Sequence, residues 1–235
     1  MSGWAARRFW AEARAVPEAA GFGVRLDGRA VRTPAKAPLV LPTLALAEAV
    51  AAEWQAQDGT IRPETMPFTR TANAAIDKVA PQTPAVVAEL ARYGETDLLC
   101  HRAPAPAALA ARQAAAWDPL LGWAAEALAA PLNPTVGVLP RAQPADSLKR
   151  LAAEVGRQDA FRLAALHDLV AIPGSLVLGL AVIRGRMTPG DAWSAARIDE
   201  DWQTEHWGED EEAAAADAVR RAAFLHAARF HALCD

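Results

Sequence analysis

The chain has 235 residues, of which 52% are hydrophobic and 22% are charged. This composition excludes a disordered or collagen-like chain, and the length suffices for one or two globular domains with a full hydrophobic core. The formal net charge is -4, with 24 Lys and Arg against 28 Asp and Glu. Nucleic-acid affinity depends largely on clustered cations that neutralise phosphates, so this charge gives no indication of a nucleic-acid partner.

The cysteines and the apolar segments bear on where the protein resides. Only two cysteines occur, Cys100 and Cys234, and neither belongs to a CxxC pair. Isolated thiols of this kind are typical of a reducing compartment. Residues 1–16 contain arginines but no apolar stretch, so they do not match a signal peptide. The most apolar segment, residues 169–183, is shorter than the ~20 residues that span a bilayer. We therefore expect a cytoplasmic protein with no membrane insertion.

A small sheet is predicted near the N-terminus. Short β-prone runs stand at residues 22–26, 29–33 and 38–41. Asp27 and Gly28 separate the first two runs, and an Asp-Gly pair favours a two-residue hairpin turn because both central positions need positive φ. Asp27 and Gly28 are therefore predicted to be structural residues that form the turn. The chain is expected to open with a twisted antiparallel sheet.

The first helix is predicted to follow the sheet. Thr43 can cap a helix that runs to about Gln57. On this helix Trp54 shares one stripe with Ala47 and Val50, which is the spacing of a buried helix face. Trp54 is therefore predicted to be a packing residue.

The rest of the chain has mostly helical spacing. Segment 61–70, with two prolines, is predicted to be an extended loop, and segment 97–101 a strand or extended link. The class is α+β, with an N-terminal domain at residues 1–82 that contains the sheet and an all-α domain at residues 83–235. Further helices are predicted over residues 71–79, 83–93, 105–129, 144–155, 159–172, 175–186, 188–206 and 209–233.

Motifs for nucleotide binding and hydrolysis are absent. Gly21 and Gly23 lie near the sheet, but a GxGxxG motif would need its third glycine at Leu26. Ser175 follows Gly174 without the second glycine of a nucleophile elbow. Turn glycines and an ordinary serine are the better interpretations.

Thiol catalysis and metal binding are also disfavoured. Cys100 and His101 are adjacent, so in extended chain their side chains point to opposite faces and cannot exchange a proton directly. His226 and His231 are five residues apart, which is not the i,i+4 spacing of a helical metal pair. The sequence gives no metal site.

The most unusual segment is the acidic stretch at residues 198–212, which also contains two tryptophans. On a helix, Asp201 and Glu205 share one face, with Trp202 and His206 beside them. Like charges at this spacing repel, so the arrangement is expected to destabilise the isolated helix unless cations approach. One interpretation is a solvated helix end, and another is a recognition surface that combines aromatic and charged side chains.

Several blocks of the chain, taken in order, resemble the family of assembly chaperones for the F1 portion of ATP synthase, specifically the chaperone of the α subunit. The most specific sequence motifs are LDGRxVRTPAK, EWxxQ and the acidic WQxxxWG segment. The matching blocks are residues 7–10, 21–43, 47–77, 93–103 and 175–210.

The resemblance implies a non-enzymatic, ATP-independent chaperone that binds unassembled F1 α and prevents its aggregation until it meets β. It also implies a fold with a small sheet-containing domain before a helical domain, and no cofactor. Client binding in the family is associated with the acidic stretch, which is carried over to Glu200, Asp201 and Glu205. Trp202 and Trp207, within the same stretch, are added as candidate contacts because exposed aromatics are common at interface centres. Composition and length are similar to those of bacterial members.

A competing interpretation is an enzyme with an unrecognised acidic, hydrolase-like site. In that case Glu200 and Asp201 would act as acid and base. A monomer is expected under either interpretation, because no heptad seam is evident.

Overall fold

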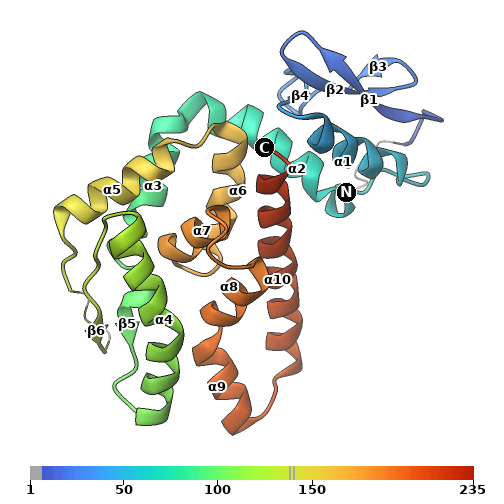
Figure 1. Cartoon of the computed structure of the whole chain (residues 1–235). Coiled ribbons are helices and arrows are strands. Elements are labelled where there is room, and N and C mark those ends of the chain that lie inside the picture. The colour runs from blue at the N-terminus through green and yellow to red at the C-terminus, as the bar shows by residue number, and fades with distance from the viewer. Residues whose placement is uncertain (1–6, 138, 140) are drawn as a thin grey trace. The chain divides into compact units, whose positions relative to one another are not determined.

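The computed structural model describes residues 7–137, 139 and 141–235 (Figure 1). Its contacts divide the chain into two compact units. Unit 1 holds the described residues up to Thr83 together with Ala160–Ala165 and Arg229–Asp235, and unit 2 holds Pro84–Asp159 and Leu166–Ala228. The two-domain division at residues 1–82 and 83–235 stays a prediction, and the contacts place two short later segments with the first unit. The α+β class is confirmed.

Unit 1 contains an antiparallel sheet centred on β2 (Gly21–Leu26). This strand pairs with β1 (Ala13–Glu18), β3 (Arg29–Ala30) and β4 (Val40–Leu41). Strand β1 was not predicted, because its sequence ARAVPE has weak β propensity and contains a proline. Among the described residues β1 pairs only with β2, and an edge strand tolerates proline.

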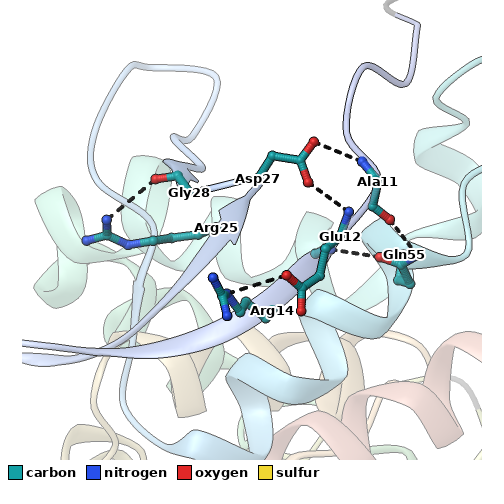
Figure 2. Close-up of polar contacts among 8 residues, drawn as sticks. Ala11, Glu12, Arg14, Arg25, Asp27, Gly28 and Gln55 are labelled. Carbon is teal, nitrogen blue, oxygen red and sulfur yellow. Dashed lines mark hydrogen bonds and ion pairs between the residues drawn. The ribbon is translucent and has the colours of Figure 1, made fainter.

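The Asp27-Gly28 turn also holds the chain that enters β1 (Figure 2). Both turn residues have positive φ, 46° and 84°, and Leu26 pairs with Arg29 across them. The Asp27 carboxylate accepts the backbone N–H groups of Ala11 and Glu12, each at 2.9 Å. These hydrogen bonds lower the pKa of Asp27. A residue predicted for turn geometry therefore also fixes a second backbone segment.

Helix α1 (Leu44–Gln55) packs along the sheet, as Figure 1 shows. The Thr43 hydroxyl accepts the Leu46 N–H, so the predicted cap is present. At the other end of the helix, the Gln55 amide donates to Ala11 O at 3.1 Å and accepts from Ala13 N at 2.7 Å (Figure 2). This side chain therefore satisfies backbone groups where the chain enters β1.

Trp54 lies half-buried against the core of unit 1. Its ring meets the buried Trp10 ring edge-on, with 5.3 Å between centroids. The Trp54 Nε1 atom is buried and has no hydrogen-bond partner among the described residues. The contribution of Trp54 therefore comes from its apolar surface.

We expect Trp54→Arg to lower the free energy of unfolding by about 3 kcal/mol, because the new charge would sit against an apolar cluster. The matched control is Trp54→Phe, which keeps the aromatic packing and removes a buried N–H without a partner. Urea denaturation of both variants measures the difference. Normal stability of Trp54→Arg would contradict a packing role.

The half-buried carboxylate of Glu53 caps the start of the second helix. Helix α2 (Pro67–Ala74) starts four residues before the predicted position, so the prediction of an extended loop over residues 61–70 is wrong at its end. The Glu53 carboxylate accepts the N–H groups of Phe68 at 2.6 Å and Thr69 at 2.8 Å, which satisfies the free donors of the first turn. Burial raises the pKa of Glu53, although these hydrogen bonds oppose the shift.

The remaining elements complete the two units. A 3₁₀ turn (Pro63–Thr65) precedes α2, and a π-helical segment (Ala75–Val79) and a second 3₁₀ turn (Ala80–Gln82) lead into the next helix. The later helices are α3 (Thr83–Arg92), α4 (Ala107–Ala127), α5 (Ala145–Gly156), α6 (Ala160–Ala171), α7 (Leu176–Ile183), α8 (Pro189–Ala196), α9 (Ile198–Trp207) and α10 (Glu211–Ala232). Strand β5 (His101–Arg102) pairs in parallel with β6 (Thr135–Val136). In the part of the chain that the structure describes, no helix has the length and apolarity to cross a bilayer.

The predicted single helix over residues 188–206 is wrong, because the chain breaks at Arg197 between α8 and α9. The buried Trp117 ring donates its N–H to the Ala195 carbonyl at 2.7 Å. In a continuous helix that carbonyl would accept the N–H of Asp199. A side chain from α4 thus takes the place of one helical hydrogen bond at the break.

Asp97 connects two segments of unit 2 from a fully buried position. It accepts the Ser175 hydroxyl at 2.7 Å, the Val177 N–H at 2.9 Å and the Leu99 N–H at 3.1 Å. The last bond caps a 3₁₀ turn (Leu98–Cys100), so the predicted strand or extended link over residues 97–101 is wrong except at His101, where β5 begins. Burial raises the pKa of the Asp97 carboxyl.

Candidate functional site

The acidic segment forms a helical hairpin at one end of unit 2. Helix α9 ends at Gly208, whose φ of 92° reverses the chain, and α10 begins three residues later (Figure 1). The Asp210 carboxylate accepts the N–H groups of Glu212 at 2.9 Å and Ala213 at 3.2 Å, which caps the start of α10. The sequence between the two helices therefore supplies both a stop signal and a start signal.

A groove of about 780 Å³ lies between these two helices. Its lining is mostly exposed and combines carboxylates, two arginines, alanines and one tryptophan. The lining residues are Arg197, Glu200, Asp201, Gln203, Thr204, Glu205, Trp207, Gly208, Glu209, Asp210, Ala213, Ala214, Asp217, Ala218 and Arg221.

Four of the five predicted contact residues line this groove: Glu200, Asp201, Glu205 and Trp207. Trp207 is 78% exposed, which is unusual for the largest apolar side chain. Trp202 does not line the groove. It is half-buried and stacks on His206 with 4.2 Å between ring centroids. Of the two predicted tryptophans, the structure thus places only Trp207 in the groove.

Arginines of the same chain neutralise much of the acidic surface, so the expectation of unrelieved repulsion is wrong for two of the three carboxylates. Glu205 accepts two hydrogen bonds from Arg112, both at 2.8 Å. Arg197 pairs with Glu200 at 2.7 Å and with Asp217 at 2.9 Å. Of these partners, only Arg197 and Glu200 are close in the sequence, as an i,i+3 pair at the start of α9. The other partners lie on different helices, so the spacing of acids along α9 could not indicate them.

Asp201 is the remaining acid of the predicted trio. Among the described residues no side chain forms an ion pair or hydrogen bond with its carboxylate, and the residue is exposed. Partial burial of the carboxyl raises the pKa of Asp201, while Arg112 and Arg197 oppose that shift. Asp201 therefore offers an acceptor that is not already occupied by another group of the described chain.

Helix α4 runs beside α8 and α9 and fixes the position of the acidic face. Three contacts follow each other along the pair: Trp117 to the Ala195 carbonyl at 2.7 Å, Gln113 to Asp199 at 2.5 Å, and Arg112 to Glu205 at 2.8 Å. These α4 residues and Asp217 were not among the residues predicted for the site. The α4 residues are far from α9 in the sequence, and Asp217 lies on α10. No spacing within α9 therefore links its acids to them.

The geometry suits binding better than acid–base catalysis. Glu200 already forms an ion pair with Arg197 at 2.7 Å, so its carboxylate is not free to act as an acid or base. The groove is open, whereas catalytic pockets enclose most of the substrate surface. In the described residues no group of three or more His, Cys, Asp or Glu side chains could hold a metal ion.

Comparisons with known proteins agree on one family. The family model described as "ATP12 chaperone protein" matches residues 7–125. The crystal structure of Atp12 from Paracoccus denitrificans is 55% identical, with 98% of this chain and 99% of that chain covered and a TM-score of 0.95. A structure from Agrobacterium tumefaciens is 41% identical, covering 97% of this chain and 85% of that one, with a TM-score of 0.90. The mitochondrial protein atp12 of Schizosaccharomyces pombe is 23% identical over 219 residues, which are 88% of this chain and 75% of that protein.

Proposed function

This chain belongs to the ATP12 chaperone family, and we propose that its client is the unassembled α subunit of the F1 portion of ATP synthase. In this proposal the protein covers the subunit interface of α until β takes its place. It acts by binding alone, without ATP, a cofactor or catalysis. It does so as a monomer in the bacterial cytoplasm.

The observation that carries the proposal is the α9–α10 groove, with an exposed Trp207 and with Asp201, whose carboxylate has no ion-pair or hydrogen-bond partner in the described part of the chain. An unassembled ring subunit exposes apolar surface that its neighbour later covers, and such a surface is an aggregation hazard. A groove that joins an exposed aromatic side chain to carboxylates can cover that surface and orient basic client residues. Charges at the rim of an interface act more on association rate and specificity than on affinity, which suits a transient complex.

Release is explained by competition. Subunit α is freed when β offers it a larger buried area, so no energy source is needed in the chaperone itself. The bonds of Gln113 and Trp117 on α4 hold α8 and α9 in place, so the backbone of the groove is already positioned when the client arrives.

Co-purification from the native host tests the function directly. A tagged copy of the chain should recover α after gentle lysis, and the α–β complex should not be recovered. The control is a tagged copy with Asp201→Lys, which places a cation in the groove and should recover much less α. Equal recovery with both copies would remove the groove from the proposal, and absence of α with the unmodified copy would contradict the client assignment.

A further inference from the structure

The ion pair between Arg112 and Glu205 has an unusual geometry for a strong interaction. A single arginine nitrogen, Nη1, donates to both carboxylate oxygens at 2.8 Å. The strongest arginine–carboxylate pairs instead use two nitrogens in a side-on fork. Glu205 is therefore occupied, but by a contact that a fork-forming guanidinium could replace.

Both side chains of this pair are accessible to solvent. The Arg112 side chain is 38% exposed and that of Glu205 is 52% exposed. An exposed pair gains little from Coulomb attraction, and its long side chains lose rotamer freedom when they meet. The Arg112 side chain can turn into solvent without disturbing a buried group.

The backbone beneath Arg112 is held in place, in contrast to its side chain. The neighbouring Gln113 is nearly fully buried and bonds both Asp199 and the Ala103 N–H. One turn further, the buried Trp117 bonds the Ala195 carbonyl. Helix α4 thus keeps the backbone of Arg112 beside α9, within reach of Glu205 for the side chain.

We propose that Arg112 is a built-in competitor for the client. In the free protein it occupies Glu205, and a client arginine displaces it by forming the side-on fork that Arg112 does not form. When the client leaves, Arg112 returns to Glu205 and stabilises the empty groove. This inference rests on the proposed chaperone function, and it assigns to Arg112 a part in making the complex reversible.

The size of the effect follows from the exposure of the pair. Exposed ion pairs change equilibria by about two- to fivefold. Removing the competitor should therefore tighten client binding by about that factor, mainly through slower dissociation. Arg112→Gln replaces the charged side chain by a neutral polar one and leaves Asp201 and the other groove residues unchanged.

The test measures association and dissociation of purified α on immobilised chaperone. The matched control is Arg186→Gln, which removes one exposed arginine of unit 2 whose side chain forms no hydrogen bond or ion pair among the described residues. Arg112→Gln should bind α about two- to fivefold more tightly than Arg186→Gln. Equal or weaker binding would overturn the proposal and would make Arg112 a bystander or a direct client contact. Melting curves check that both variants are folded.

A double-mutant cycle with Glu205→Gln decides whether Arg112 acts through Glu205. In the Glu205→Gln background the gain from Arg112→Gln should disappear. A gain of the same size in both backgrounds would overturn the proposal, because it would reflect a general change in charge. Failure of the unmodified protein to bind α would contradict the proposed function instead, so the two failures are distinguishable.

Discussion

Replacement of Asp97 by Ala is expected to lower the free energy of unfolding by about 3–5 kcal/mol. The carboxylate is fully buried and receives a hydroxyl and two backbone N–H groups from separate segments. Alanine leaves these donors without partners in a site closed to water, and each buried unsatisfied donor costs about 1–3 kcal/mol. The start of α7 and the 3₁₀ turn before β5 should loosen together.

The two cysteines provide a local readout of this effect. Cys100 belongs to unit 2 and Cys234 to unit 1, and both are buried. Burial raises the pKa of the Cys100 thiol to about 12, so in the folded protein it should react slowly with iodoacetamide. In Asp97→Ala, mass spectrometry should find faster labelling of Cys100 than in the unmodified protein, with little change at Cys234.

Asp97→Asn is the conservative control. It keeps an acceptor oxygen and loses the charge, so we expect a smaller loss of stability than in Asp97→Ala. Urea denaturation that gives the same midpoint for Asp97→Ala and the unmodified protein would refute a structural role for this carboxylate. Equal acceleration of labelling at both cysteines would show that the two units open together.

Neutralising Glu200, Asp201 and Glu205 together is expected to slow the association of purified α by about tenfold at low salt. The attraction between an acidic groove and basic client residues acts over a distance and mainly before contact. The deficit should shrink at high salt, because screening already suppresses the attraction in the unmodified protein. Association kinetics at two ionic strengths measure both effects.

The stability of this triple variant should change little. The pairs of Glu200 and Glu205 with their arginines are partly exposed, and such pairs contribute about 0–1 kcal/mol each. Relief of repulsion alone would raise the free energy of unfolding slightly. The loss of these two ion pairs offsets that gain. A large drop in melting temperature would instead identify the carboxylates as structural.

A second triple variant controls for net charge. Glu48→Gln, Asp58→Asn and Glu64→Gln remove three exposed acids from unit 1 and leave the groove intact. Its association with α should stay close to that of the unmodified protein. If both triple variants slow association equally, overall charge rather than the groove attracts the client.

Features that depend on neighbouring residues could be predicted from the sequence. The Asp27-Gly28 turn and the Thr43 cap follow from the backbone preferences of those residues, and the structure has both. The acidic stretch at residues 198–212 was also visible, because its unusual composition is a local property. The motif blocks indicated the family before any coordinates, and the family model and solved structures confirm it.

The tertiary structure decided the features that depend on residues far apart in the chain. Strand β1 exists because β2 pairs with it, α2 begins early because Glu53 supplies its cap, and the break before α9 coincides with a bond from Trp117. The ion pairs of the groove also depend on residues that are far apart in the chain. Arg112 and Glu205 are 93 positions apart and meet only because α4 packs beside α9. Acidic residues can thus be located from the sequence, whereas which of them are already neutralised depends on the packing of helices that no local pattern encodes.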